Sequence, residues 1–283
     1  MTSTSPPIAA SQPAVPPPAH HVGFGHLMLA EWTKIRSVRS TLWTLLLFVV
    51  VTLGLTALFT WLTVHAVNQG KASGRAASIV ADPTGFILGT GLGLGQLAIC
   101  VLGVLVITSE YSTGTIRASL LAVPKRLPML AAKAAVFSVL VLVIGEIVAF
   151  GSFLIGSALA RSLVKVSLSD PNVTRAVVGA GLYLTVLGLF ALAIGNLIRH
   201  TAGAVTTVIG LVLVIGPLLA LLPYSWGAHI HEYFPTVAGA LITADHQQSN
   251  QLLSPWQGFG VFCLWTALLL ARAPTCCNAA TRS

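Results

Sequence analysis

Apolar residues in this chain gather in six long runs that are separated by short polar segments. A helix that crosses the hydrocarbon core of a bilayer needs about 20 mostly apolar residues. The runs therefore predict an all-α integral membrane protein with six transmembrane helices. We expect the spans at Leu42–His65, Gly85–Thr108, Leu130–Leu159, Ala176–Ile198, Ala202–Leu222 and Gln257–Ala271.

The spans differ in how well the sequence defines them. Only Arg199, His200 and Thr201 separate the fourth span from the fifth, which predicts a tight helical hairpin. The sixth span is the weakest, because its uncharged run is short. The second span carries two tracks of glycines at four-residue spacing, a pattern that lets helices approach closely. We favour packing within the subunit over a dimer interface for these tracks, which are Gly85, Gly89 and Gly93, and Gly91 and Gly95.

Composition supports a lipid environment. Charged residues make up only 8% of the chain, against roughly 25% in soluble domains. The net charge of +8 comes from Lys and Arg residues scattered through loops, which argues against nucleic-acid binding. Neither a disulfide framework nor a metal site is expected from the four cysteines.

The two ends of the chain look different from its middle. Residues 1–24 are rich in Pro, Ala and Ser, which predicts a disordered tail. They lack the basic and apolar regions of a cleavable signal peptide. Residues 25–272 form the predicted membrane domain, and residues 273–283 form a short tail.

The distribution of Lys and Arg predicts that both termini lie in the cytoplasm. With that orientation the cytoplasmic set has ten members: Lys34, Arg36, Arg39, Arg117, Lys125, Arg126, Lys133, Arg199, Arg272 and Arg282. The opposite set has five: Lys71, Arg75, Arg161, Lys165 and Arg175.

Two cytoplasmic segments have amphipathic patterns. Before the first span, one helical face carries Met28, Trp32, Ile35 and Val38. This favours a short interfacial helix with its apolar face in lipid and its cations near anionic head groups. Alternatively, its basic residues only anchor the first span.

The second segment follows the second span, at Thr113–Val123, and ends at Pro124. Ile116, Leu120 and Val123 form an apolar face on it. A helix this short is not stable alone, so docking into a groove of a partner is favoured. Alternatively, the following basic pair only enforces topology.

Three stretches carry a family resemblance: EWTKIRSVRSTLWTL, EYSTGTIRASLLAVPKRLPMLAAK and LSPWQGFGVFCLWTALL. They resemble the permease subunits of bacterial ABC-2 type transporters, most of all the actinobacterial branch, over nearly the whole chain after residue 24. The resemblance implies an ABC-2 (type V exporter-like) architecture with an N-terminal interfacial helix. It also implies that part of residues 223–255 dips back into the membrane.

The resemblance assigns roles to particular residues. It implies a coupling helix that docks on a separate ATPase through Tyr111, Thr113, Ile116, Arg117, Leu120 and Val123. It implies an interfacial elbow helix with Met28, Trp32, Lys34, Ile35, Arg36 and Arg39. The pump would contain two permeases, as a homodimer or heterodimer, and two ATPases in the cell membrane.

ATP hydrolysis is not expected in this chain. A phosphate-binding loop needs a Gly-rich turn followed by Gly-Lys-Ser/Thr, but Gly70–Lys71 is followed by Ala72. We therefore expect a non-catalytic subunit of an exporter, without a cofactor, in which a separate partner chain hydrolyses ATP.

A secondary transporter or channel is the alternative function. The chain has one intramembrane Glu and no evident inverted repeat, which argues against this alternative. His229, His231 and Glu232 have metal-ligating side chains, but we expect no metal site there, because the nearby Tyr224, Trp226, Tyr233 and Trp256 are typical of an interfacial aromatic belt.

Glu146 is the one charged residue that we expect deep inside a span. Intramembrane acids are costly and often mark transport pathways. Two interpretations stay open: a polar contact on a translocation route or subunit interface, and a protonated Glu hydrogen-bonded to a neighbouring helix.

Beyond Leu270 the chain departs from the family's apolar run and basic tail, and we hypothesise a frameshift near Ala271.

Overall fold

The computed structural model describes residues 24–37, 39–71, 73–113, 126–222, 224–246 and 251–272. Within these ranges the chain is helical and contains no strand, which confirms the all-α prediction. The elements are α1 (Phe24–Ser37), α2 (Arg39–Asn68), α3 (Ser73–Ala81), α4 (Pro83–Thr113), α6 (Arg126–Ala160), α7 (Val173–Ile198), α8 (Thr201–Ile209), the π-helix η1 (Gly210–Ile215), α9 (Gly216–Leu219), α10 (Tyr224–Glu232), α11 (Pro235–Ala240), the 3-10 helix η2 (Leu241–Thr243) and α12 (Pro255–Arg272).

Five helical stretches in the described residues are long and apolar enough to cross a membrane. They correspond to the first five predicted spans and are Arg39–Asn68, Pro83–Tyr111, Pro128–Ala160, Val173–Ile198 and Thr201–Leu219. The sixth predicted span is helical as α12, but it is not among the five. Its first turn contains Trp256 and Gln257 and its last residue is Arg272, so its uncharged apolar run is short. The five apolar helices are consistent with a multi-pass membrane protein.

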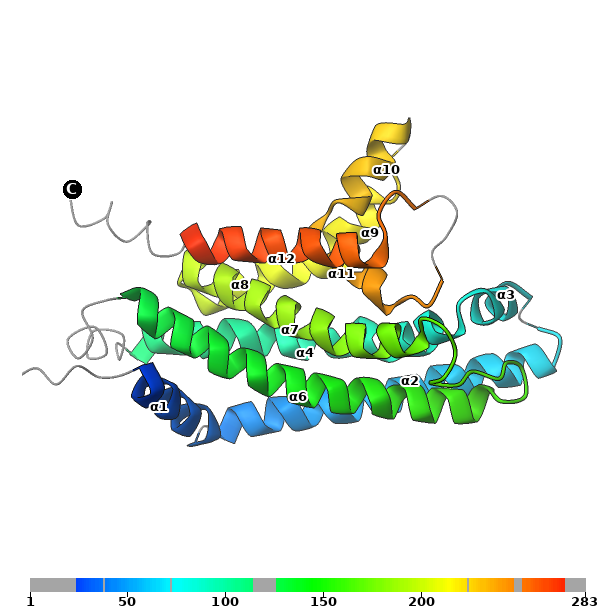
Figure 1. The fold of residues 1–283 in the computed structure, drawn as a ribbon, viewed down its shortest axis with the longest axis horizontal. Helices are drawn as coiled ribbons and strands as arrows, with labels where there is room; N and C mark the ends of the chain where they lie inside the picture. The colour runs from blue at the N-terminus through cyan, green and yellow to red at the C-terminus, as the bar shows by residue number, and fades with distance from the viewer. Residues whose placement is uncertain are drawn as a thin grey trace, which may run out of the picture.

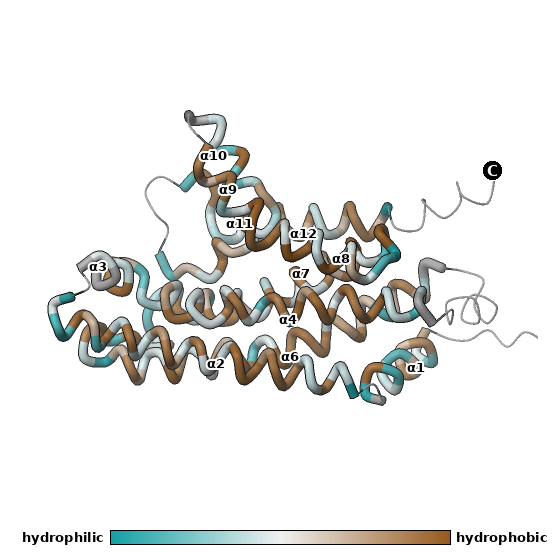
Figure 2. Tube along the Cα trace, turned by 180° about the vertical axis from the view of Figure 1, so that it is seen from behind, coloured by the Kyte–Doolittle hydropathy of each residue, from teal (hydrophilic) through white to brown (hydrophobic). Residues whose placement is uncertain are grey.

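The long helices α2, α4, α6 and α7 run lengthwise through the bundle (Figure 1). Helix α7 is the central helix, because 78% of its most apolar 18-residue stretch is buried, against 22% of the corresponding stretch of α2. Helix α1 and the end of α12 lie at the end of the bundle where α4 ends and α6 begins, and α3 lies at the opposite end. We call the end where α4 ends and α6 begins the loop end. Figure 2 shows mostly hydrophobic colours along the long helices and hydrophilic colours near their ends.

Helix α2 presents different residue types to lipid and to the bundle. Its outward face carries exposed Leu46, Val50 and Leu58, whereas Thr52 and Thr56 on the opposite face are fully buried. Leucine side chains suit contact with lipid tails, and small threonines allow close helix packing.

One glycine track of α4 packs against these threonines. A Cβ atom on Gly91 would lie 2.5 Å from the carbonyl oxygen of Thr52, and one on Gly95 would lie against the Thr52 side chain. In contrast, a Cβ atom on Gly89 or Gly93 would meet no atom within 4 Å beyond its own stretch of helix. Packing within the subunit therefore accounts for the Gly91 and Gly95 track but not for Gly89 and Gly93.

The predicted hairpin between the fourth and fifth spans is present. Helix α7 ends at Ile198, and Arg199 takes a left-handed conformation with φ of 57° that reverses the chain. His200 then caps α8, because its Nδ1 accepts a hydrogen bond of 3.2 Å from the Gly203 amide. Such a cap satisfies an amide that the first turn of a helix leaves unpaired.

The α2–α4 contact predicts that Gly91→Ala destabilises the protein and Gly89→Ala does not. Both substitutions gain about 1 kcal/mol of intrinsic helix propensity. Only the methyl group at 91 meets α2, where overpacking costs about 1–3 kcal/mol. Denaturant unfolding of the detergent-solubilised chain, followed by circular dichroism, measures both variants. Equal stabilities of the two would contradict the packing described here.

Candidate functional site

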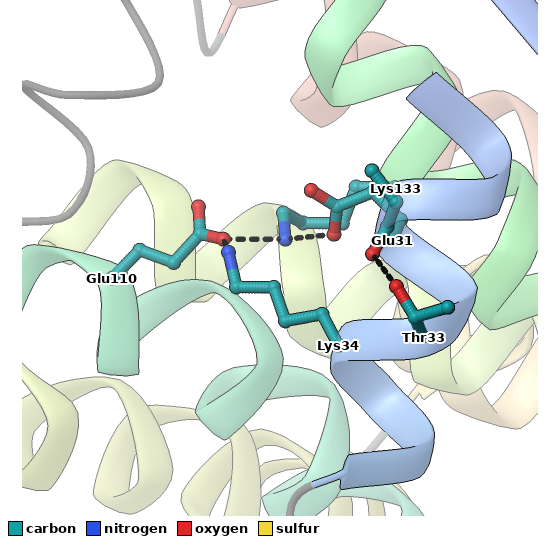
Figure 3. Close-up of polar contacts among 6 residues, drawn as sticks. Glu31, Thr33, Lys34, Glu110 and Lys133 are labelled. Atoms are coloured by element: carbon teal, nitrogen blue, oxygen red, sulfur yellow. Dashed lines mark hydrogen bonds and ion pairs between the residues drawn. The ribbon is translucent and has the colours of Figure 1, made fainter. Parts of the chain in front are cut away.

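Four charged side chains from three helices meet at the loop end (Figure 3). Lys133 of α6 places its Nζ 2.6 Å from Glu31 Oε2 of α1 and 2.8 Å from Glu110 Oε1 of α4. Lys34, also on α1, pairs with the same Glu110 oxygen. We call Glu31, Lys34, Glu110 and Lys133 the charge cluster.

Burial makes this pairing obligatory for two members of the cluster. The side chains of Lys133 and Glu110 are each 2% exposed, whereas those of Glu31 and Lys34 are 12% and 41% exposed. Removing an ion from water costs several kcal/mol, so buried ions persist only when they are paired. With two ammonium groups and two carboxylates, the cluster balances its own charge.

The cluster joins α1 to the helices on both sides of residues 114–125. Helix α4 leads into that segment, and α6 follows it. Glu31 and Lys34 lie three residues apart, which puts them on one face of α1. Any displacement of the adjoining ends of α4 or α6 must therefore move α1 as well or break a buried ion pair.

A second contact at the loop end connects α4 to α7. The Tyr111 hydroxyl donates a 2.7 Å hydrogen bond to Asn196 Oδ1. The Arg199 guanidinium lies 6.0 Å from the centre of the Tyr111 ring, within the range of a cation–π interaction. The turn between α7 and α8 is thereby linked to the last turns of α4.

The predicted docking residues fall partly within the described chain. Tyr111 and Thr113 belong to the end of α4, which continues past the predicted boundary at Thr108. The other four lie outside the described residues, and their role stays a prediction: Ile116, Arg117, Leu120 and Val123.

The predicted elbow helix corresponds to α1, with two differences in its surroundings. Trp32 and Arg36 are exposed and Met28 is half-buried, whereas Arg39 is not part of α1 but the exposed first residue of α2. Ile35, however, is buried against the bundle. The ammonium of Lys34 pairs with Glu110, whereas the sequence predicts it among lipid head groups.

Glu146 lies between α6 and α7. A Cβ atom on Gly181 would come within 2.5 Å of the Glu146 carboxyl carbon, so the missing side chain at 181 makes room for the carboxyl group. Glu146 Oε2 is buried and has no hydrogen-bond partner among the described residues. Glu146 is also not the only charged residue inside the apolar helices, because Glu110 and Lys133 fall within two of the five spanning stretches.

The opposite end has its own polar contact, which fixes the segment after η2. Arg175 Nη2 of α7 donates to the Ala244 and Asp245 carbonyl oxygens at 2.9 and 3.3 Å. The Thr84 amide donates to Asp245 Oδ2 at 3.3 Å. Asp82 accepts from the Asp245 amide at 3.3 Å, and burial beside the Asp245 carboxylate raises the pKa of Asp82 to about 7.

Glu232 anchors the segment before α12, because it accepts hydrogen bonds from the amides of Leu252 and Leu253 at 2.8 and 3.0 Å. Across the part of the chain that the structure describes, no three His, Cys, Asp or Glu side chains are placed to hold a metal ion.

Over the ranges that the structure describes, the chain is a helical protein with five apolar helices of membrane-spanning length. Comparison of the sequence with protein-family models and with curated proteins finds no match. The resemblance to ABC-2 permeases therefore depends on the sequence motifs alone.

The sequence marks Lys133 as an unusual residue but does not identify the acidic residues that pair with it. Lys133 lies inside the predicted third span, and a cation within an apolar run is expected to have a buried partner. Glu31 and Glu110 could not be chosen as those partners, because the choice depends on where α1 crosses the bundle.

We expect Lys133→Met to destabilise the protein by about 3–5 kcal/mol, because it leaves two carboxylates without their shared buried cation. Methionine keeps the apolar stem of the side chain, so the loss reports the charge. Adding Glu110→Gln should recover part of the stability.

The matched control is Arg36→Met on the exposed face of α1, which should change stability by less than about 0.5 kcal/mol. Chemical unfolding in detergent measures all three variants. A Lys133→Met protein as stable as Arg36→Met would show that the cluster contributes nothing.

Proposed function

We propose that this chain is the membrane-spanning permease subunit of an ATP-binding cassette exporter that is driven by a separate ATPase. It would cross the cell membrane six times, with both termini in the cytoplasm, and would pair with a second permease of the same or a different sequence. Residues 111–123 would dock on the ATPase.

The charge cluster is the observation that carries this proposal. An ATPase outside the membrane must transmit its movement through a short contact, and residues 114–125 connect α4 directly to α6. The buried ion pairs join the adjoining ends of both helices to α1. A push on this segment would therefore reach three helices together, as a coupling element requires.

The sixth span of the proposal is α12. It has 18 residues, which at 1.5 Å per residue gives a length of about 27 Å, close to the roughly 30 Å hydrocarbon core. Phe262 of α12 is fully buried, with ring centroids 5.8 Å from Tyr183 and 5.7 Å from Phe190 of α7. An even number of spans also fits the location of α1 and the end of α12 at the same end of the bundle (Figure 1).

A secondary transporter or channel is the second candidate, and Glu146 is the observation that favours it. A buried carboxyl oxygen without a partner could take part in ion or proton passage. Transport by the isolated chain under an ion gradient would favour this function over the ATP-driven one.

Substitution of Ile116 and Leu120 by Asn tests the docking role. These changes remove the apolar face that a partner groove would bind, so we expect the tagged double variant to retain less than about a tenth of the ATPase that co-purifies with the unmodified chain. ATP-dependent export should fall with it.

The matched control is Leu252→Asn, an exposed apolar position near the start of α12 at the opposite end. It should leave both co-purification and export unchanged. Full retention of the ATPase by the double variant would refute docking at this segment.

A further inference from the structure

A cleft opens beside the charge cluster, between α1, the first turns of α2, α4 and α6. Its volume is about 120 Å³. One buried water needs only about 10–15 Å³ by this kind of measure, so the cleft has room for several polar groups. Its wall includes Glu31, Lys34, Ser40, Thr44, Leu105 and Val106.

We propose that this cleft binds the head group of a phosphatidylethanolamine molecule, with the lipid phosphate at Lys34 and its primary ammonium at Glu31. The inference depends on the proposed function in one respect, the location of α1 at the cytoplasmic surface of the membrane. The lipid would be a bound component of the permease and not its cargo.

The charges of the cleft favour a head group that carries both signs. Lys34 and Glu31 lie three residues apart on one face of α1 and both line the cleft. The charge cluster to which they belong is already balanced, so a net anionic ligand would leave an uncompensated charge there. A head group with one phosphate and one ammonium adds no net charge.

A primary ammonium fits Glu31 better than a quaternary one. A carboxylate accepts strong hydrogen bonds from charged N–H donors, and choline has no N–H to donate. The Glu31 carboxylate already accepts a hydrogen bond of this kind, at 2.6 Å, from the primary ammonium of Lys133. Phosphatidylethanolamine is therefore preferred over phosphatidylcholine.

The remaining wall of the cleft changes from polar to apolar, as a lipid does below its head group. The Ser40 hydroxyl stands at the start of α2, where it can donate to a phosphate oxygen, and Thr44 lies one turn further along the same wall of the cleft. Leu105 and Val106 of α4 are half-buried beside them and provide an apolar surface for the first part of an acyl chain.

Thr44→Trp tests the site without altering the charge cluster. The Thr44 hydroxyl donates its hydrogen bond to the Ser40 carbonyl oxygen of its own helix, and an indole at 44 would fill the cleft. Leu47→Trp is the matched control, because Leu47 is 58% exposed on α2 and does not line the cleft.

Native mass spectrometry of the purified full chain, titrated with phosphatidylethanolamine, phosphatidylcholine or phosphatidylglycerol, measures binding. We expect the unmodified chain and Leu47→Trp to bind phosphatidylethanolamine most tightly, and Thr44→Trp to bind it about tenfold more weakly, a difference of about 1.4 kcal/mol. Equal binding by the two Trp variants, or a preference for either of the other lipids, would overturn the proposal. The measurement needs no ATPase, so its outcome is separate from that of the docking experiment.

Discussion

The pairing of the Lys133 ammonium with the carboxylates of Glu31 and Glu110 is the interaction on which the loop end depends. In a bilayer or a packed helix bundle, little water is present to solvate an ion, so each of these charges is tolerated because the others are there. The consequence is positional: α1 cannot leave the bundle, and the adjoining ends of α4 and α6 cannot separate, without exposing a buried charge. An electrostatic requirement is thus converted into a mechanical connection among three helices.

The rest of the bundle is held by different forces at different depths. Along the middle, Gly91 and Gly95 allow α4 to pack directly on the threonine face of α2, so the contact depends on close van der Waals packing. At the end opposite the charge cluster, Arg175 and Thr84 bond the segment after η2 to α7 and α4. A packed interface of this kind resists gradual deformation. We therefore expect any conformational change to occur by exchange of polar contacts at the two ends.

Much of the fold could be predicted from the sequence, because long apolar runs and short polar breaks determine where helices cross a membrane. The five apolar helices and the hairpin at Arg199 followed from that pattern alone. The candidate site did not, because the choice of Glu110 as a partner of Lys133 depends on helix rotation and on the placement of α1. The same limit applied to the glycines, since Gly89 and Gly91 look equivalent in sequence but face different surroundings.

The proposed function requires the loop end to be on the cytoplasmic side of the membrane, where an ATPase would reach residues 114–125. Labelling of intact cells with a membrane-impermeant maleimide tests it directly. The background is a chain with Ser at 263, 276 and 277, in which the remaining Cys100 is buried. We predict that Lys71→Cys is labelled in intact cells and that Arg117→Cys is labelled only after the cells are opened. Labelling of Arg117→Cys in intact cells, with Lys71→Cys protected, would contradict the account.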